Sequence, residues 1–145
     1  MIVDAVREYM LTCPLLSGKK ININCLGTKP GSLSLDNVKV DPVIRKYCDG
    51  SMLKQAVFDF GVRGRYDEIM GENLDISTFL EEIEAWICKQ NLLKILPEFA
   101  SDNLIAKGIE VTKSGYLHDT SMGSGRWQME FRIIYRQNEY VQIGT

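Results

Sequence analysis

Two long stretches in which apolar and polar residues alternate constrain the fold more than any other feature of the sequence. In the first, Met52 to Tyr66, apolar side chains fall on one face of an extended chain and polar side chains on the other. The apolar positions are Ala56, Phe58, Phe60 and Val62, and the polar positions are Gln55, Asp59, Arg63 and Arg65. Because successive side chains of a strand point to opposite faces, this stretch predicts a strand that covers a core. Its polar face would meet solvent or a neighbouring subunit.

The second alternating stretch lies near the C-terminal end. Its apolar positions are Trp127, Met129, Phe131, Ile133 and Tyr135, and its polar positions are Gln128, Glu130, Arg132 and Arg136. A shorter strand is predicted before it, where Ile109 and Val111 alternate with Glu110 and Thr112. Small and polar residues dominate 117–125 between the two, so a loop is expected there.

Two segments have the periodicity of amphipathic helices. The first runs from Ile2 to about Met10, and the second runs from about Ile76 to Leu96. Thr78 and Glu81 fit a capping box at the start of the second helix, and Pro97 is a stop signal after it. On this helix Ile76, Phe79, Leu80, Ile83, Ile87 and Gln90 share the face expected to meet the core.

Two further strands are predicted in the first third of the chain, at 20–26 and around 38–40, where Asp41-Pro42 breaks the second. The expected order is α-β-β-β-α-β-β. Helices and strands do not alternate one by one, so we predict an α+β fold, a mostly antiparallel sheet with two helices packed on one face. At 145 residues the chain is expected to form a single domain, 1–145.

Charge and hydrophobicity exclude several classes of function. The formal net charge is −2, whereas nucleic-acid-binding proteins usually carry a basic excess, so we expect no specific nucleic-acid binding. No apolar run approaches the roughly 20 residues of a membrane span. Asp4, Arg7 and Glu8 interrupt the N-terminal segment, which is therefore interpreted as an amphipathic helix and not as a targeting signal.

The cysteines have no zinc-ligand spacing. Cys13, Cys25, Cys48 and Cys88 form no CxxC pair, and His118 is the one histidine of the chain. Cys25 and Cys88 fall within apolar patterns and are expected to be buried free thiols. A reducing cytoplasm is the expected setting, although the spacing leaves a disulfide open.

Three groups of residues are candidates for a catalytic, phosphate-binding or metal-binding site. His118, Asp119 and Ser121 are too close in sequence to take up triad geometry. The stretch 123–126 is glycine-rich, but it lacks a P-loop ending and precedes a strand, so a hairpin loop is the preferred interpretation. The glutamates at 81, 82 and 84 are interpreted as a solvated helix face. No cofactor, metal or catalytic residue is predicted.

The arginines on the predicted strands leave two interpretations open. Arg63, Arg65, Arg126, Arg132 and Arg136 lie on polar strand faces or at strand ends. They could line a solvated face, or they could contact another subunit, since arginine is enriched in protein interfaces. Trp86 is expected in the core, and Trp127 either in the core or in a subunit contact.

The last third of the chain resembles the closing hairpin of the tail-terminator or minor capsid proteins of long-tailed bacteriophages. The residues that carry the resemblance are Ile109-Glu110-Val111-Thr112, Gly115-Tyr116-Leu117-His118-Asp119-Thr120 and Gly125-Arg126-Trp127-Gln128-Met129-Glu130-Phe131-Arg132-Ile133-Ile134-Tyr135. Proteins of this family tend to have an aromatic-Leu-x-Asp-Thr stretch, then a small-residue loop, then a strand that begins Arg-aromatic-Gln. The layout upstream is also similar, with an N-terminal helix, strands and a glutamate-rich helix before the hairpin.

The resemblance implies a non-enzymatic virion or prophage protein that forms a ring, expected to be a hexamer. Such a ring caps the tail tube, and its partners are other copies, the tail tube protein and a head-completion protein. The expected location is the virion, and the bacterial host cytoplasm during assembly. Together with the arginine pattern, the resemblance gives a set of candidate subunit contacts: Arg63, Arg65, Asp119, Arg126, Trp127 and Arg132. On this hypothesis Arg126→Glu impairs assembly and leaves the monomer folded.

Two other classes of function are alternatives. A small ligand-binding or regulatory α+β module would have an apolar cavity with a few convergent polar groups. An enzyme without a familiar motif would have perturbed titratable groups in a cleft, and His118 with Asp119 is the place where they would be expected.

Overall fold

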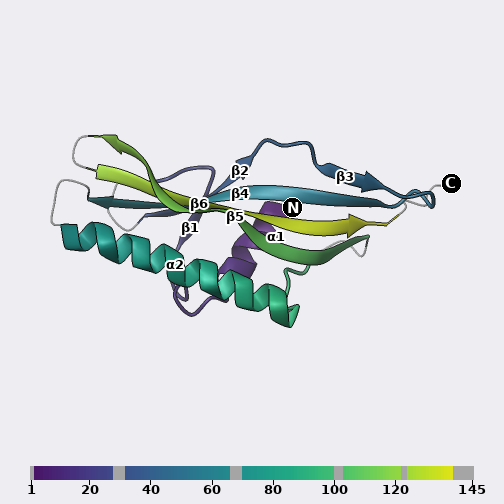
Figure 1. Cartoon of the computed structure of the whole chain (residues 1–145), viewed down its shortest axis with the longest axis horizontal. Helices are drawn as coiled ribbons and strands as arrows, with labels where there is room; N and C mark the ends of the chain where they lie inside the picture. The colour runs from purple at the N-terminus through teal and green to yellow at the C-terminus, as the bar shows by residue number, and fades with distance from the viewer. Residues whose placement is uncertain (1, 28–31, 66–69, 100–102, 122–123, 139–145) are drawn as a thin grey trace.

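The computed structural model describes residues 2–27, 32–65, 70–99, 103–121 and 124–138, which form an elongated molecule of one sheet and two helices (Figure 1). The elements are α1 (Ile2–Met10), β1 (Ile21–Ile23), β2 (Leu33–Val38), β3 (Val43–Lys46), β4 (Met52–Arg65), α2 (Met70–Leu93), β5 (Leu104–Ser121) and β6 (Ser124–Gln137). Neither helix is both long enough and apolar enough to cross a membrane, as far as the described residues show.

The strands form one six-stranded sheet in the order β1-β2-β4-β6-β5, and β3 pairs with β4 beyond the end of β2. All pairings are antiparallel except that of β1 with β2. The predicted α+β class and the mostly antiparallel sheet are therefore confirmed. The order is α-β-β-β-β-α-β-β, with one strand more than predicted.

The additional strand arises near Asp41-Pro42. The strand expected around 38–40 is displaced, because β2 ends at Val38 and β3 begins only at Val43. Leu33 and Leu35 of β2 are buried and face the core, which gives this strand its place in the sheet. The first predicted strand is also shorter than expected, because β1 ends at Ile23 and Asn24 has a left-handed φ of 55°.

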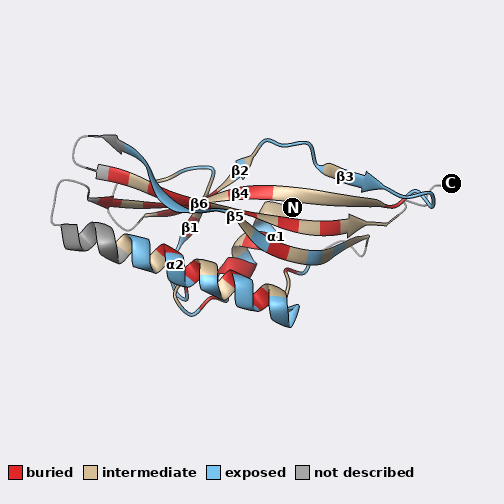
Figure 2. Cartoon of the chain, in the orientation of Figure 1, coloured by how far each residue is buried: buried red, intermediate tan, exposed pale blue. Residues whose placement is uncertain are grey.

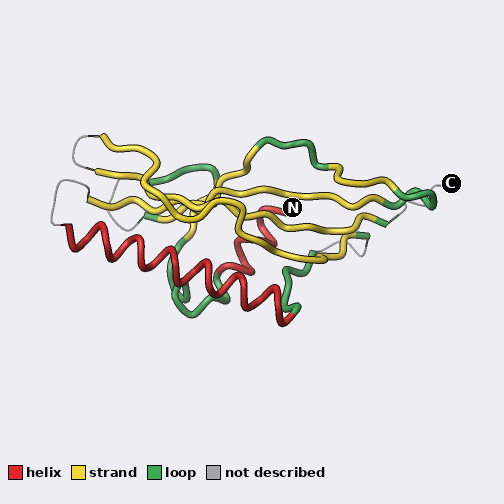
Figure 3. Tube along the Cα trace, viewed as in Figure 1, coloured by secondary structure: helices red, strands yellow, loops and turns green. Residues whose placement is uncertain are grey.

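The long strands have the predicted faces. Phe58 of β4 pairs with Phe131 of β6, and their rings lie 5.7 Å apart. Phe60 pairs with Met129, and all four of these side chains are almost fully buried. Figure 3 shows these strands running along most of the length of the molecule, with α2 beside them. The structure thus confirms the face that the alternation in the sequence predicted to cover the core.

Both helices pack on that same face. Val6 and Met10 of α1 and Leu80, Ile83 and Ile87 of α2 join the core cluster with the inner sheet residues, and Figure 2 shows the buried stripe of α2 turned toward the sheet. The bounds of α1 are as predicted. The start of α2 was predicted wrongly: the helix begins at Met70, so Thr78 lies inside it and cannot cap it.

The C-terminal end of α2 is set by backbone geometry before Pro97 is reached. Lys94 has a left-handed φ of 58°. Its N–H donates to the carbonyl of Asn91 (3.2 Å), and the N–H of Ile95 donates to the carbonyl of Gln90 (3.0 Å). These two bonds form a Schellman motif with lysine in the position that glycine usually takes.

The hairpin of β5 and β6 is longer than expected. β5 continues to Ser121 and β6 begins at Ser124, so the loop predicted at 117–125 is mostly strand. Four register shifts interrupt the pairing of β5 with β6. Such bulges break the apolar–polar alternation that identifies a strand in a sequence, which explains why this part of β5 was missed.

The cysteines differ from expectation in their burial. Cys25 and Cys88 are exposed, Cys13 is the buried one, and none of the four forms a disulfide. Burial raises the pKa of the Cys13 thiol. The apolar neighbours of Cys25 and Cys88 in the sequence therefore did not indicate burial of the thiols themselves.

Candidate interaction surface

The face of the sheet opposite the helices carries a continuous set of polar side chains; we call it the open face. In the part of the chain that the structure describes, no helix lies on it (Figure 1). The register places Ser34 and Asp36 of β2, Asp59 of β4 and Gln128 and Glu130 of β6 in neighbouring rows. The open face is therefore the surface where a contact with another molecule has to be considered first.

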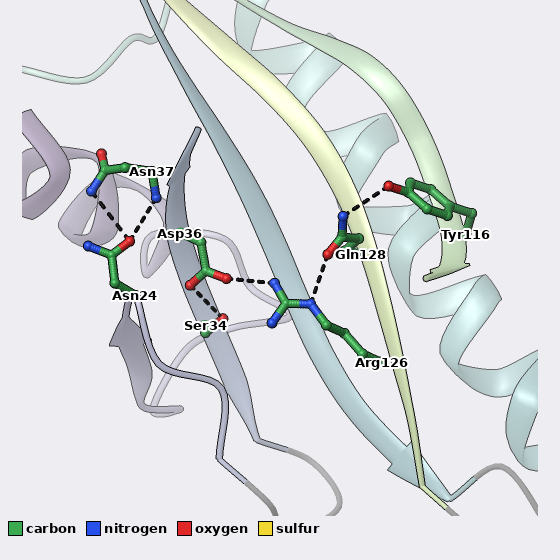
Figure 4. A network of polar contacts seen from close by, with 7 residues as sticks. All are labelled: Asn24, Ser34, Asp36, Asn37, Tyr116, Arg126 and Gln128. Carbon is green, nitrogen blue, oxygen red and sulfur yellow. Dashed lines mark hydrogen bonds and ion pairs between the residues drawn. The ribbon is translucent and has the colours of Figure 1, made fainter. Parts of the chain in front are cut away.

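A polar network crosses four strands of the open face (Figure 4). Nη2 of Arg126 donates to Oδ2 of Asp36 at 2.6 Å, and Nε of Arg126 donates to Oε1 of Gln128 at 2.8 Å. Nε2 of Gln128 donates to the hydroxyl of Tyr116 (2.9 Å), and the hydroxyl of Ser34 donates to Oδ1 of Asp36 (3.0 Å). The network thus links β2, β6 and β5 across the intervening β4.

Gly61 of β4 makes this bridge sterically feasible. A Cβ atom at Gly61 would lie 3.1 Å from Nη2 of Arg126 and 3.3 Å from Oγ of Ser34. The guanidinium of Arg126 therefore lies directly over a strand position without a side chain. The ion pair is well shielded, since the side chains of Arg126 and Asp36 are 19% and 23% exposed.

Two other arginines of β6 make ion pairs along the same face. Arg132 binds Glu110 of β5 and also donates to Oε1 of Gln55 on β4 at 3.0 Å. Arg136 lies near the turn after β3, where it donates to Asp49 (3.3 Å) and to the hydroxyl of Ser51 (3.0 Å). Arg132 is thereby held by the two strands that flank β6, and Arg136 by the turn between β3 and β4.

A row of carboxylates crosses the sheet beside this network. Asp36, Asp59 and Glu130 are register neighbours on β2, β4 and β6. Burial raises the pKa of Asp59, the charges of Glu130 and Asp36 raise it further, and the nearby Arg126 partly offsets the rise. Glu130 accepts a hydrogen bond from Thr112 at 2.6 Å and lies 3.9 Å from Lys113. The described residues contain no group of His, Cys, Asp or Glu placed to hold a metal ion.

The candidate contact residues from the sequence fall into three groups. Arg126 and Arg132 lie on the open face, and Asp119 on β5 is the register partner of Arg126. Arg63 donates from Nε to the carbonyl of Gly27 (3.2 Å), and the backbone of Arg65 ends β4, while its side chain lies outside the described part. Trp127 is only 3% exposed and belongs to the core, so of its two interpretations the structure favours core packing.

Several residues of the network were not predicted. Asp36 lies before the strand expected around 38–40, Gly61 was not singled out, and Tyr116 lies between the strand expected at 109–112 and the loop expected at 117–125. Alternation did place Gln128 on the polar face. Asp36 and Arg126 are 90 positions apart, and no local pattern relates two such residues.

His118 does not lie in a cleft with other titratable groups in the described structure. It is exposed on β5, and its ring contacts Tyr116 edge-on with centroids 5.9 Å apart.

Comparison with known proteins adds no assignment. No protein-family model matches the chain, and no curated protein sequence matches it.

Proposed function

We propose that this chain is a structural subunit of a long-tailed bacteriophage or prophage, a tail-terminator or minor capsid protein without enzymatic activity. Its copies form a ring that caps the tail tube and joins it to the head connector. The protein acts in the virion and is made in the cytoplasm of the bacterial host. The ring is a hexamer, and its outer partners are the tail tube protein and a head-completion protein.

The observation that carries this proposal is the one-sided sheet. α1 and α2 cover the inner face, and the open face presents arginines whose positions are fixed by ion pairs within the chain. Side chains that are already ordered lose less conformational entropy when a partner binds. A ring needs two different surfaces on each subunit, because its contacts are head-to-tail. A molecule with one helical face and one polar sheet face provides such a pair of surfaces.

The edge strand β5 is partly blocked, which is compatible with assembly that stops at a closed ring. The N–H of Ile109 donates to Oδ1 of Asn91 (3.1 Å), and the N–H of Gly115 donates to Oε2 of Glu84 (2.7 Å). Side chains of α2 therefore occupy hydrogen-bonding positions in the middle of this edge strand. Blocking an edge in this way prevents unlimited strand addition. Exposed Ile105 and Leu117 lie near its ends, where a neighbour could still make contact.

Light scattering coupled to size exclusion tests the proposal. We expect the purified chain to form one discrete oligomer as its concentration rises, and a chain that stays monomeric at every concentration would contradict the proposal. Arg126→Glu is a poor probe of assembly, because it would place a second carboxylate beside Asp36 and disturb the monomer.

Lys113→Glu is a cleaner probe of the open face. Its side chain is 63% exposed, so solvent should screen the added carboxylate from Glu130, 3.9 Å from Lys113, far better than at the shielded position of Arg126, and the monomer should tolerate the change. We expect assembly to require a several-fold higher protein concentration. Lys89→Glu makes the same change of charge at an exposed position of α2 and is the matched control. Equal behaviour of the two variants would show that the open face takes no part in assembly.

A further inference from the structure

A broad groove lies on the helical side of the molecule, between α1, the C-terminal part of α2 and the segment 95–99. Its volume is about 1050 Å³. Tyr9, Trp86 and Phe99 contribute aromatic rings to it, and the rings of Tyr9 and Trp86 lie 5.3 Å apart at 44°. The hydroxyl of Tyr9 donates to the carbonyl of Ile95 at 2.7 Å, which joins the two sides of the groove. The elements that form the groove are therefore held together by contacts within the chain.

The charged residues that line this groove are all acidic. Asp4, Glu8 and Glu98 are among its lining residues, and no lysine or arginine is among the described residues that line it. Glu8 and Glu98 are exposed at its rim. An aromatic surface bordered by carboxylates favours a partner that has both apolar and cationic side chains.

Exposed apolar residues lie at the C-terminal end of α2 and directly after it, and Figure 2 shows this end of the helix as largely exposed. Leu92, Leu93 and Ile95 are 81%, 56% and 51% exposed, and Ile95 also lines the groove. Large apolar side chains gathered in this way on a surface usually mark a contact with another protein. We call this surface the acidic groove; its floor contains Tyr9, Trp86 and Phe99, and its rim contains Glu8 and Glu98.

A second part of the same chain has the complementary character. The segment 39–47 contains β3 and carries the exposed apolar residues Val40, Ile44 and Tyr47. It also carries Lys39, Arg45 and Lys46, against the single acid Asp41. In the described structure β3 pairs only with β4. β3 is a strand of the sheet, and Figure 1 shows it on the far side of β4 from α2, so the segment and the acidic groove are separate surfaces.

We propose that the basic segment 39–47 of one copy docks in the acidic groove of the next copy, and that this contact is part of the lateral interface of the ring, beside the contacts of the open face. The inference rests on the proposed function, because it supplies the head-to-tail interface that such a ring requires. Like-with-like pairing is disfavoured, since two acidic grooves would repel each other and so would two basic segments. Ile44 would meet the aromatic floor, Lys46 on the same face of β3 would approach Glu8 or Glu98, and Arg45 would add positive charge beside the rim.

Charge reversal on each side tests the contact. The groove variant carries Glu8→Lys and Glu98→Lys, and the segment variant carries Arg45→Glu and Lys46→Glu; all four positions are exposed. We expect each variant alone to need an at least about tenfold higher concentration to assemble than the unmodified chain. An equimolar mixture should assemble again, because the two variants can alternate around an even-numbered ring. Each native basic segment then meets a native acidic groove, and each acidic segment meets a basic groove.

The controls separate the inference from the proposed function. Glu81→Lys with Glu82→Lys makes the same charge change at exposed positions of α2, and thermal unfolding of every variant shows whether it folds. If both reversed variants assemble like the unmodified chain, the inference is wrong and the ring proposal stands. A mixture that fails to recover assembly also overturns the inference, and would assign the groove to another occupant, such as a cationic small molecule. An unmodified chain that never assembles contradicts both.

Chemical cross-linking gives a second readout that needs no variant. Carbodiimide joins carboxylates to amines in contact, so assembled rings of mixed light and isotope-labelled copies should give cross-links between chains. We expect Glu8 or Glu98 of one chain to be joined to Lys39 or Lys46 of another. Assembled rings in which these inter-chain cross-links are missing would overturn the inference.

Discussion

Arg126 illustrates at the scale of one residue how this sheet holds its polar face together. Its guanidinium lies over Gly61 of β4 and reaches Asp36 on β2, two strands away from its own. Because both side chains are largely shielded from solvent, the pair should be coupled more strongly than an exposed ion pair. Arg136 and Asp49, at 38% and 62% exposure, provide an exposed pair for comparison in the same protein.

A double-mutant cycle with Arg126→Met and Asp36→Asn measures this coupling. We expect a coupling free energy of about 1 kcal/mol from urea unfolding. The same cycle with Arg136→Met and Asp49→Asn should give a smaller value. Equal couplings in the two cycles would show that shielding of the Arg126 pair has no energetic consequence.

Asp59 predicts a dependence of stability on pH. Its pKa is raised above the ordinary value of 3.8 by burial and by the charges of Glu130 and Asp36. The protonated form therefore favours the folded state; its contribution is complete below the ordinary pKa and is lost as the pH rises through the raised pKa. At neutral pH the charged Asp59 opposes folding.

The substitution Asp59→Asn should accordingly increase the free energy of unfolding near neutral pH. The gain should shrink as the pH is lowered toward the ordinary pKa of a carboxyl, where Asp59 is itself uncharged. Urea unfolding at several pH values measures both effects. Asp36→Asn, which removes the partner of Arg126, should instead destabilise the protein and serves as the control. A pH-independent effect of Asp59→Asn would contradict the account.

At the scale of elements, the contact of α2 with β5 depends on a close approach at one glycine. A Cβ atom at Gly115 would lie 2.8 Å from Cδ1 and 2.9 Å from Cβ of Leu80, which is buried in the core. At Gly108, on the same strand, the nearest atom would be Oδ1 of Asn91 at 3.3 Å. The two glycines therefore differ in how much room a side chain would have.

Gly115→Ala should destabilise the fold by roughly 1–3 kcal/mol, because the helix or the strand must shift to admit the methyl group. Gly108→Ala should cost clearly less, and thermal or urea unfolding of the two variants makes the comparison. If both substitutions have the same effect, the approach of α2 to β5 is not limited by Gly115.

The elements also show which parts of the fold a sequence can predict. α1, β4 and β6 were predicted well because each has a long regular pattern and one fully buried face. The far part of β5 was missed because it is an exposed, bulged edge strand whose side chains do not alternate in burial. The end of α2 was misplaced because Lys94 adopts the left-handed conformation without the glycine that usually signals it.

At the scale of the whole molecule, the two candidate interaction surfaces, the open face and the acidic groove, could be predicted only in part. Alternation correctly assigned Arg132 to the polar face, and Arg126 was expected on a polar face or at a strand end. The partners of both arginines lie on other strands and depend on the sheet order. The acidic groove was not predicted, because its lining comes from parts of the chain as far apart as Tyr9 and Ile95, which are separated by 86 positions. Trp86, expected in the core, is half-buried there beside Tyr9.

At the same scale, the proposed ring assembly depends on the two unlike sides of the molecule. The helical side carries the acidic groove, and the sheet carries an ordered polar face with the basic segment 39–47 at one end. Negative-stain electron microscopy of the purified chain at high concentration tests this account most directly. We expect class averages of a closed ring with six-fold rotational symmetry and a central channel; particles that show only monomers, or open filaments of unlimited length, would contradict it.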